Sequence, residues 1–181
     1  MKKITTFTKD LKTKIGLAIV ALSIFSGFSV IYVCYKATPE KLFSENYHPY
    51  ERRILRGVSD SSSLKNFYSN GKMDSVILEF NTSKAPVPEE FLLAGIAYLE
   101  KNLPQKAIET FKLMIQKNAD SNSDMFEDDA EYYLAMSYLN NQEPEKAMPI
   151  FEKIQSEPDH PYNSNVSEWF LLNVKTSIAK K

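Results

Sequence analysis

The sequence predicts an all-α protein, in which an N-terminal transmembrane helix precedes a short α-solenoid of helical hairpins and a C-terminal capping helix. Two stretches of the chain repeat each other at an offset of 40 residues, a period typical of stacked helix pairs. Residues 15–35 form an uncharged, apolar run long enough for one membrane-spanning helix. Only five of the 181 residues are Gly, which also favours a helical body.

The composition is that of an ordinary globular chain, with 43% hydrophobic and 25% charged residues. The formal net charge is −1, whereas domains that bind nucleic acid are usually strongly basic, so we expect no nucleic-acid partner. The single cysteine, Cys34, excludes a disulfide within the chain.

The N-terminal region predicts a single-pass membrane protein. Residues 1–14 form a basic tail, which by the positive-inside rule is cytoplasmic, and the repeat domain then lies on the outer, periplasmic side. A helix over residues 15–35 is about 30 Å long, which makes the lipid bilayer a predicted partner. Arg52, Arg53 and Arg56 oppose this orientation. A cleaved signal peptide, a soluble helix and a lipoprotein acceptor at Cys34 are the alternatives.

Residues 36–63 are predicted to form a juxtamembrane linker. Pro39 ends the first helix, because proline disfavours helical geometry in the residue before it. The rest mixes short apolar pieces with Pro49 and Gly57, and a short helical segment is expected at Glu40–Asn46.

The repeat domain is expected at residues 64–181, with repeats at 88–118 and 126–157. In each repeat, apolar residues recur three and four residues apart, as on one face of a helix. Proline then begins the second helix. Small residues let the two helices approach, and aromatic residues fill the space between neighbours. The predicted packing residues are Gly95, Tyr98, Ala107 and Phe111, with Ala135, Tyr138, Ala147 and Phe151.

Two further segments complete the predicted domain. A degenerate repeat at residues 64–82 carries Tyr68, Val76 and Phe80, which match Tyr98, Ala107 and Phe111 when one residue is omitted. A capping helix is expected at residues 164–180. The acidic run at residues 127–131 suits the positive end of a helix dipole, with a cation site as the alternative.

Residues 95–98 followed by Ala107 and Phe111 resemble the tetratricopeptide repeat, as do residues 135–138 followed by Ala147 and Phe151. The whole layout is similar to membrane-anchored tetratricopeptide proteins of the bacterial cell envelope. The resemblance implies that the first helix of each pair lines a concave groove that binds a protein partner. The implied groove residues are Leu92, Ile96, Glu100, Tyr132, Met136 and Asn140. The alternative is that Leu92, Ile96 and Tyr132 belong to the core.

No catalytic, cofactor or metal constellation is found in the sequence. His48 and His160 each lie in a His-Pro-Tyr triplet, over a hundred residues apart, which is unlike a metal site. We therefore expect an interaction scaffold or adaptor, without enzymatic activity or cofactor, that binds another envelope protein of unspecified identity. The alternative is self-association as a structural component of a membrane assembly. A non-catalytic subunit of an enzyme or an unrecognised hydrolase is the third hypothesis.

Overall fold

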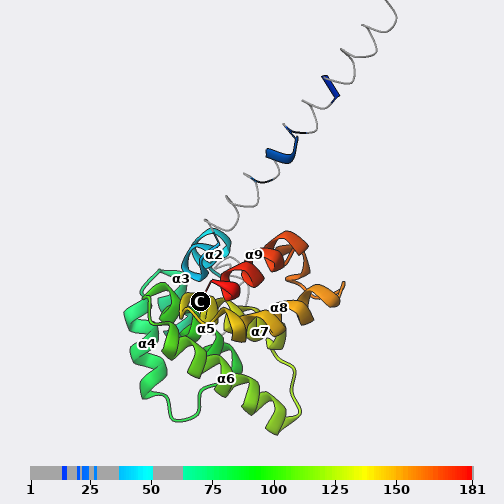
Figure 1. The fold of residues 1–181 in the computed structure, drawn as a ribbon. Coiled ribbons are helices and arrows are strands. Elements are labelled where there is room, and N and C mark those ends of the chain that lie inside the picture. The colour runs from blue at the N-terminus through cyan, green and yellow to red at the C-terminus, as the bar shows by residue number, and fades with distance from the viewer. Residues whose placement is uncertain are drawn as a thin grey trace, which may run out of the picture. The chain divides into compact units, whose positions relative to one another are not determined.

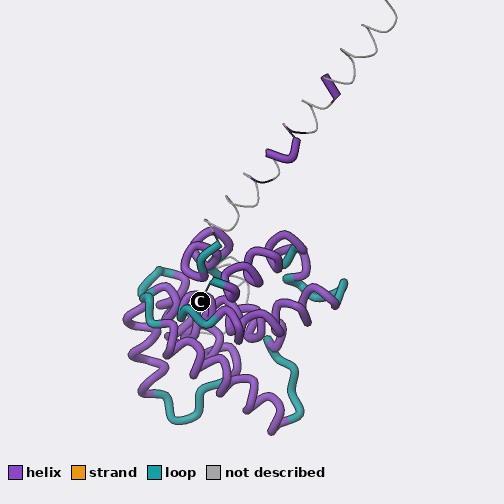
Figure 2. Tube along the Cα trace, in the orientation of Figure 1, coloured by secondary structure: helices purple, strands orange, loops and turns teal. Residues whose placement is uncertain are grey.

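The part of the chain that the structure describes is helical. The structure is a computed structural model, and it describes residues 14–15, 20, 22–24, 27, 37–50 and 63–180. The chain divides into two units, Met1–Ala37 and Thr38–Lys181. Within the described residues the second unit contains helices and loops and no strand, which confirms the predicted all-α class (Figure 2).

The expected membrane localisation is corrected by the structure. Crossing a bilayer takes about 20 consecutive apolar residues in one helix. No helix among the described residues is long and apolar enough to do so. The single-pass assignment, with a cytoplasmic N-terminus and an outer repeat domain, is therefore not supported. Most of the predicted span at residues 15–35, and the basic tail up to residue 13, lie outside the described residues.

Three helical hairpins follow one another along the second unit (Figure 1). Neighbouring hairpins contact each other, and the last helix packs on the third hairpin, which makes the architecture that of a helical-repeat solenoid. The hairpins are α3 (Ser63–Ser69) with α4 (Met73–Thr82), α5 (Pro88–Glu100) with α6 (Pro104–Ser121), and α7 (Glu127–Asn140) with α8 (Pro144–Ser156). The short 3₁₀ helix η2 (Asn163–Asn165) and α9 (Glu168–Ala179) complete the unit.

Local sequence signals explain where these helices begin. Pro88, Pro104 and Pro144 each occupy the first turn of a helix, where the missing N–H has no intrahelical partner to lose. The carboxylate of Glu90 also accepts a hydrogen bond from the backbone N–H of Val87, at 3.2 Å. At α9, the hydroxyl of Ser167 accepts from the N–H of Phe170, at 3.1 Å.

The turn inside each hairpin has the same backbone geometry. Gly71, Asn102 and Gln142 adopt left-handed conformations, with φ of 72°, 55° and 58°. In each turn, the N–H of the next residue donates to a carbonyl five residues back: Lys72 to Phe67, Leu103 to Tyr98, and Glu143 to Tyr138, at 2.8–2.9 Å. This pattern is a Schellman motif, and its threefold recurrence shows that the degenerate first hairpin is built like the other two.

The shared turn corrects the sequence alignment of the first repeat. Phe67 accepts the hydrogen bond that Tyr98 and Tyr138 accept in the later hairpins, so Phe67 occupies their place. Tyr68 was expected there, with one residue omitted from the repeat. With Phe67 in register, Val76 and Phe80 align with Ala107 and Phe111 and no residue is missing.

One phenylalanine per hairpin connects it to the next element. Phe80 contacts Phe91, Phe111 stacks on Tyr133, and Phe151 contacts Phe170, with ring centroids 5.1, 6.2 and 4.9 Å apart. The first two pairs join the second helix of a hairpin to the first helix of the following one, and the third joins α8 to the C-terminal helix α9. These aromatic pairs therefore hold the hairpins in a continuous stack.

Gly95 on α5 allows the ring of Phe111 on α6 to lie directly against the α5 backbone. A Cβ atom at this position would lie only 2.5 Å from two carbon atoms of the Phe111 ring. Phe111 is fully buried and so has little room to move. The third hairpin has alanine at the equivalent position, Ala135.

We expect Gly95→Ala to lower the free energy of unfolding by about 1–3 kcal/mol, because the added methyl group overpacks the contact with Phe111. Urea unfolding followed by circular dichroism measures this change. A smaller penalty for Gly95→Ala in a Phe111→Leu background would identify the ring as its cause. An equal penalty in both backgrounds would contradict the explanation.

Candidate protein-binding face

Residues 38–50, here called the strap, pack against the repeat helices. They contain α2 (Pro39–Asn46), which contacts α7 and α9 (Figure 1). Leu42 on α2 is buried, and the side-chain amide of Gln142 donates to the carboxylate of Glu40 at 2.6 Å. This segment was expected to be part of a linker, but its apolar side chains are covered by the repeat domain.

Three tyrosine hydroxyls bind the backbone of the strap. Tyr132 donates to the carbonyl of Asn46, Tyr133 to that of His48 and Tyr68 to that of Tyr50, at 3.3, 3.0 and 3.1 Å. The accepting carbonyls belong to alternate residues, with Asn46 at the end of α2 and His48 and Tyr50 in the non-helical segment after it. The donors lie on the first helices of two hairpins, α3 and α7. We call the surface of α3, α7 and α9 that contacts the strap the inner face.

Aromatic rings fill the space between the strap and the inner face. The ring of Tyr133 is central, with the edges of Tyr47 and Tyr50 at centroid distances of 6.2 and 6.4 Å. Phe43 stacks on Tyr47 at 4.9 Å, and on the other side Tyr132 stacks on Tyr162 at 4.1 Å. Both His-Pro-Tyr triplets thus place their tyrosine against Tyr133, since Tyr162 lies 5.9 Å from it.

Burial keeps these hydroxyls in the protonated form that can donate. It raises the pKa of Tyr132 to about 12. The pKa of Tyr50 is also raised to about 12, by burial and by the nearby carboxylates of Asp129 and Glu89. Burial likewise raises the pKa of Tyr133. The tyrosine side chains therefore act as neutral donors throughout the physiological pH range.

Four of the six predicted groove residues lie in the interior. Leu92, Ile96 and Met136 are fully buried and Tyr132 is 2% exposed, whereas Glu100 and Asn140 are half-buried. The reason is that their helices are contacted from several sides: α5 by α3, α4, α6 and α7, and α7 by α5, α6, α8 and α2. As packed here, these four residues do not face solvent, and their binding role stays a prediction.

The sequence reasoning did not identify Tyr68, Tyr133 or the strap as parts of this surface. Tyr68 was assigned to repeat packing. The signal that was available is the abundance of tyrosine, ten residues in all, five of which lie at residues 47, 50, 68, 132 and 133. Tyrosine pairs an apolar ring with a donor, which suits surfaces that bind peptide backbone.

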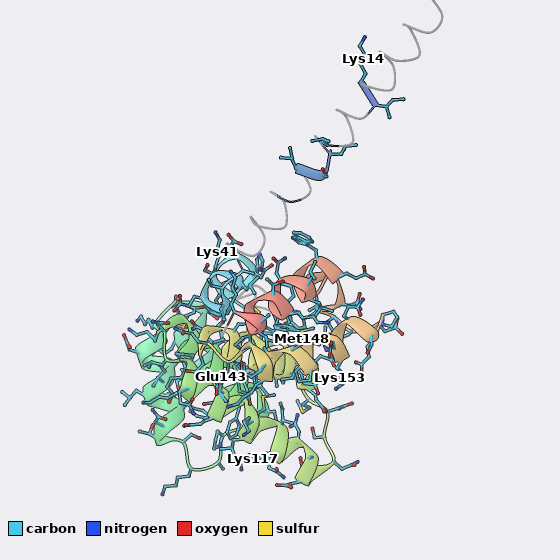
Figure 3. All side chains as sticks on the ribbon, in the orientation of Figure 1. Lys14, Lys41, Lys117, Glu143, Met148 and Lys153 are labelled. Carbon is cyan, nitrogen blue, oxygen red and sulfur yellow. The ribbon has the colours of Figure 1, made fainter. Side chains whose placement is uncertain are left out.

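A surface hollow lies away from the inner face. It measures about 370 Å³, lies between the start of α5 and the end of α6, and is lined by residues that include Pro86, Met114 and Lys117. The ammonium group of Lys117 lies 5.8 Å from the Phe91 ring centroid. Figure 3 shows Lys117 on α6, well away from Lys41 on the strap. None of the six predicted groove residues lines this hollow.

The hairpins and their stacking define a helical-repeat protein, the class whose surfaces bind other proteins. A sequence model of the tetratricopeptide repeat matches residues 129–160, which contain most of α7, all of α8 and the turn that follows. This match supports the tetratricopeptide-repeat family. Repeats of this family typically bind other proteins and are generally non-enzymatic, so the match also supports an interaction role. No curated protein and no solved structure matches the chain.

Removing the hydroxyl donors should loosen the strap without unfolding the repeats. We expect Tyr132→Phe with Tyr133→Phe to cost about 1 kcal/mol per hydrogen bond, because both rings remain. Hydrogen exchange of the backbone amides of residues 38–50 should then be roughly tenfold faster or more. Tyr138→Phe, whose ring lies under the ammonium of Lys146, is the matched control and should leave the strap unchanged. Unchanged exchange in the double variant would contradict the proposed bonds.

The carboxyl group of Asp129 holds in place an aromatic ring that packs against the inner face. It accepts a hydrogen bond of 2.5 Å from Tyr162, the tyrosine that stacks on Tyr132. Burial raises the pKa of Asp129 above its usual 3.8, and Asp128 adds to this, while the bond from Tyr162 and the nearby His160 lower it. The folded state therefore binds the proton of Asp129 more tightly than the unfolded state does.

This shift predicts a pH-dependent effect of Asp129→Asn. The contribution of Asp129 to unfolding free energy falls as pH rises from 3.8 through the raised folded-state pKa. The amide is neutral throughout, so the variant should gain stability relative to wild type between about pH 3.5 and pH 7. Urea unfolding at both pH values measures the difference, with Asp124→Asn in an exposed loop as control. A difference independent of pH would contradict the shift.

Proposed function

We propose that this chain is an interaction scaffold whose inner face binds a segment of another protein. The observation that carries the proposal is that this face already binds a peptide, the strap, through three hydroxyl–carbonyl hydrogen bonds. In this proposal the predicted groove residues on α7, Tyr132, Met136 and Asn140, form the floor and edge of the binding surface. The predicted groove residues on α5, Leu92, Ile96 and Glu100, support it, because α5 packs on α7.

Access to the floor requires the strap to move. Tyr132 is buried in contact with it, so a partner reaches this ring only when residues 38–50 leave. Asn140 is the last residue of the same helix, α7. Its side-chain nitrogen is buried without a hydrogen-bond partner among the described residues. A peptide carbonyl at the edge of the face is a suitable acceptor for this donor.

The second candidate function is self-association of the repeat domain. Trp169 and Leu172 lie one turn apart on α9, at the end of the hairpin stack, and are 59% and 49% exposed. An exposed pair of large apolar side chains at the end of a solenoid is a suitable contact for another copy of the chain.

Photo-crosslinking from defined positions separates these functions. A photoreactive residue at Gln142, which is exposed and hydrogen-bonded to the strap, should give a distinct protein adduct in cells. The same residue at Lys112, on the exposed side of α6, is the control and should give none. A third variant carries the photoreactive residue at Trp169.

Adducts between copies of the chain, formed from Trp169 alone, would favour self-association. Equal capture of a protein from Gln142 and from Lys112 would contradict binding at the inner face, because Lys112 lies on a helix that does not contribute to it.

A further inference from the structure

We propose that the strap is an internal ligand, which competes with a partner segment of the same chemistry: a short apolar helix followed by an extended stretch with aromatic side chains. This inference rests on the proposed function and adds two things to it. It states what kind of segment the inner face accepts, and it states that the free chain keeps this face occupied by residues 38–50 of its own.

The first support is that backbone atoms of the strap make the hydrogen bonds. The carbonyls of Asn46, at the end of α2, and of His48 and Tyr50, in the segment that follows, are backbone groups that any peptide carries, whatever its side chains. A partner segment can therefore replace the strap bond for bond. The donors span from α3 to α7, and the accepting carbonyls run from the last residue of α2 to Tyr50, so a partner segment needs a helix end followed by at least four non-helical residues.

The second support is the arrangement of apolar side chains on the strap, which indicates the sequence that a partner segment needs. Leu42 is 6% exposed on α2, and Phe43 stacks on Tyr47 with an angle of 27° between ring planes. Tyr47 and Tyr50 both place ring edges against Tyr133, at 72° and 74°. A partner segment thus needs a buried aliphatic side chain, and aromatic side chains five and eight residues after it.

The third support concerns charge at the extended end. Tyr50 lies near the carboxylates of Asp129 and Glu89, at the first turns of α7 and α5. The carboxylate of Asp129 disfavours a negative charge at this place, whereas that of Glu89 is paired with the ammonium group of Lys65 at 2.6 Å. The face therefore rejects segments with an acidic residue where the strap has Tyr50.

The fourth support is that the strap is held less firmly than the repeats it covers. In the strap itself only Leu42 is buried, whereas on α5 nine consecutive residues from Phe91 to Leu99 are buried. The three hydroxyl–carbonyl hydrogen bonds, the exposed bond from Gln142 to Glu40 and partly exposed rings provide the rest of the contact. The strap remains competitive because it belongs to the same chain and so has a high effective concentration.

The test measures binding of a fluorescent synthetic peptide, residues 38–50, to the full-length chain by fluorescence anisotropy. Leu42→Glu in the protein weakens the strap and leaves the inner face intact. An internal ligand lowers apparent affinity in proportion to the fraction of open chains, so this variant should bind the peptide about tenfold more tightly or better. Glu45→Gln, on the exposed side of α2, is the matched control and should bind like wild type.

Changes in the peptide test the sequence preference. A Tyr47→Ala peptide and a Tyr50→Glu peptide should each bind the Leu42→Glu protein at least about tenfold more weakly than the native peptide. Equal binding of all three peptides would overturn the stated partner chemistry. If Leu42→Glu lowers helicity in circular dichroism, Tyr47→Ser in the protein replaces it, since Tyr47 is only half-buried.

Equal peptide affinity for wild type and the strap variants would overturn the internal-ligand role. The proposed function would still stand if Gln142 continued to capture a partner. Concentration-dependent dimers of the full-length chain that dissociate on adding the peptide would also overturn the inference, because the segment then comes from a second copy.

Discussion

The contact between Gly95 and Phe111 is the constraint on which the candidate site depends. Because residue 95 has no side chain, the Phe111 ring lies where a Cβ atom would otherwise be. The same ring stacks on Tyr133 of the next hairpin, with an angle of 19° between their planes. Tyr133 in turn donates to the strap carbonyl at His48 and packs against Tyr47. Core packing in one hairpin therefore positions the central ring of the inner face.

Much of the fold was predictable because local patterns determine it. Helical spacing of apolar residues, together with Pro104 and Pro144 at helix starts, indicated paired helices, and the all-α class is confirmed. The first repeat was aligned one residue out, because Tyr68 looks like Tyr98 in sequence. Only the hydrogen bonds of the turn reveal that Phe67 has that role. Residue type alone cannot separate two adjacent aromatic residues on one helix.

The candidate site was less predictable because it depends on contacts between distant parts of the chain. The bonds from Tyr132 and Tyr133 to the strap join residues 86 and 85 positions apart. An apolar stripe on a helix has the same pattern whether it faces a partner, a neighbouring helix or a segment of its own chain. For that reason the sequence left two interpretations of Leu92 and Ile96 open, the groove that the family resemblance implies and the core. The membrane assignment failed for a related reason, since it depended on an uncharged run without any structural context.

In the proposed function, the strap connects the stability of the repeat domain to its binding of a partner. An uncovered inner face would expose the rings of Tyr132 and Tyr133 and the apolar groups around them, which favours aggregation. Covering this face with residues 38–50 avoids that exposure while the chain is free. A partner then gains only the difference between its own contacts and those of the strap, which makes binding selective. Weak, non-aromatic segments are excluded by competition rather than by steric obstruction.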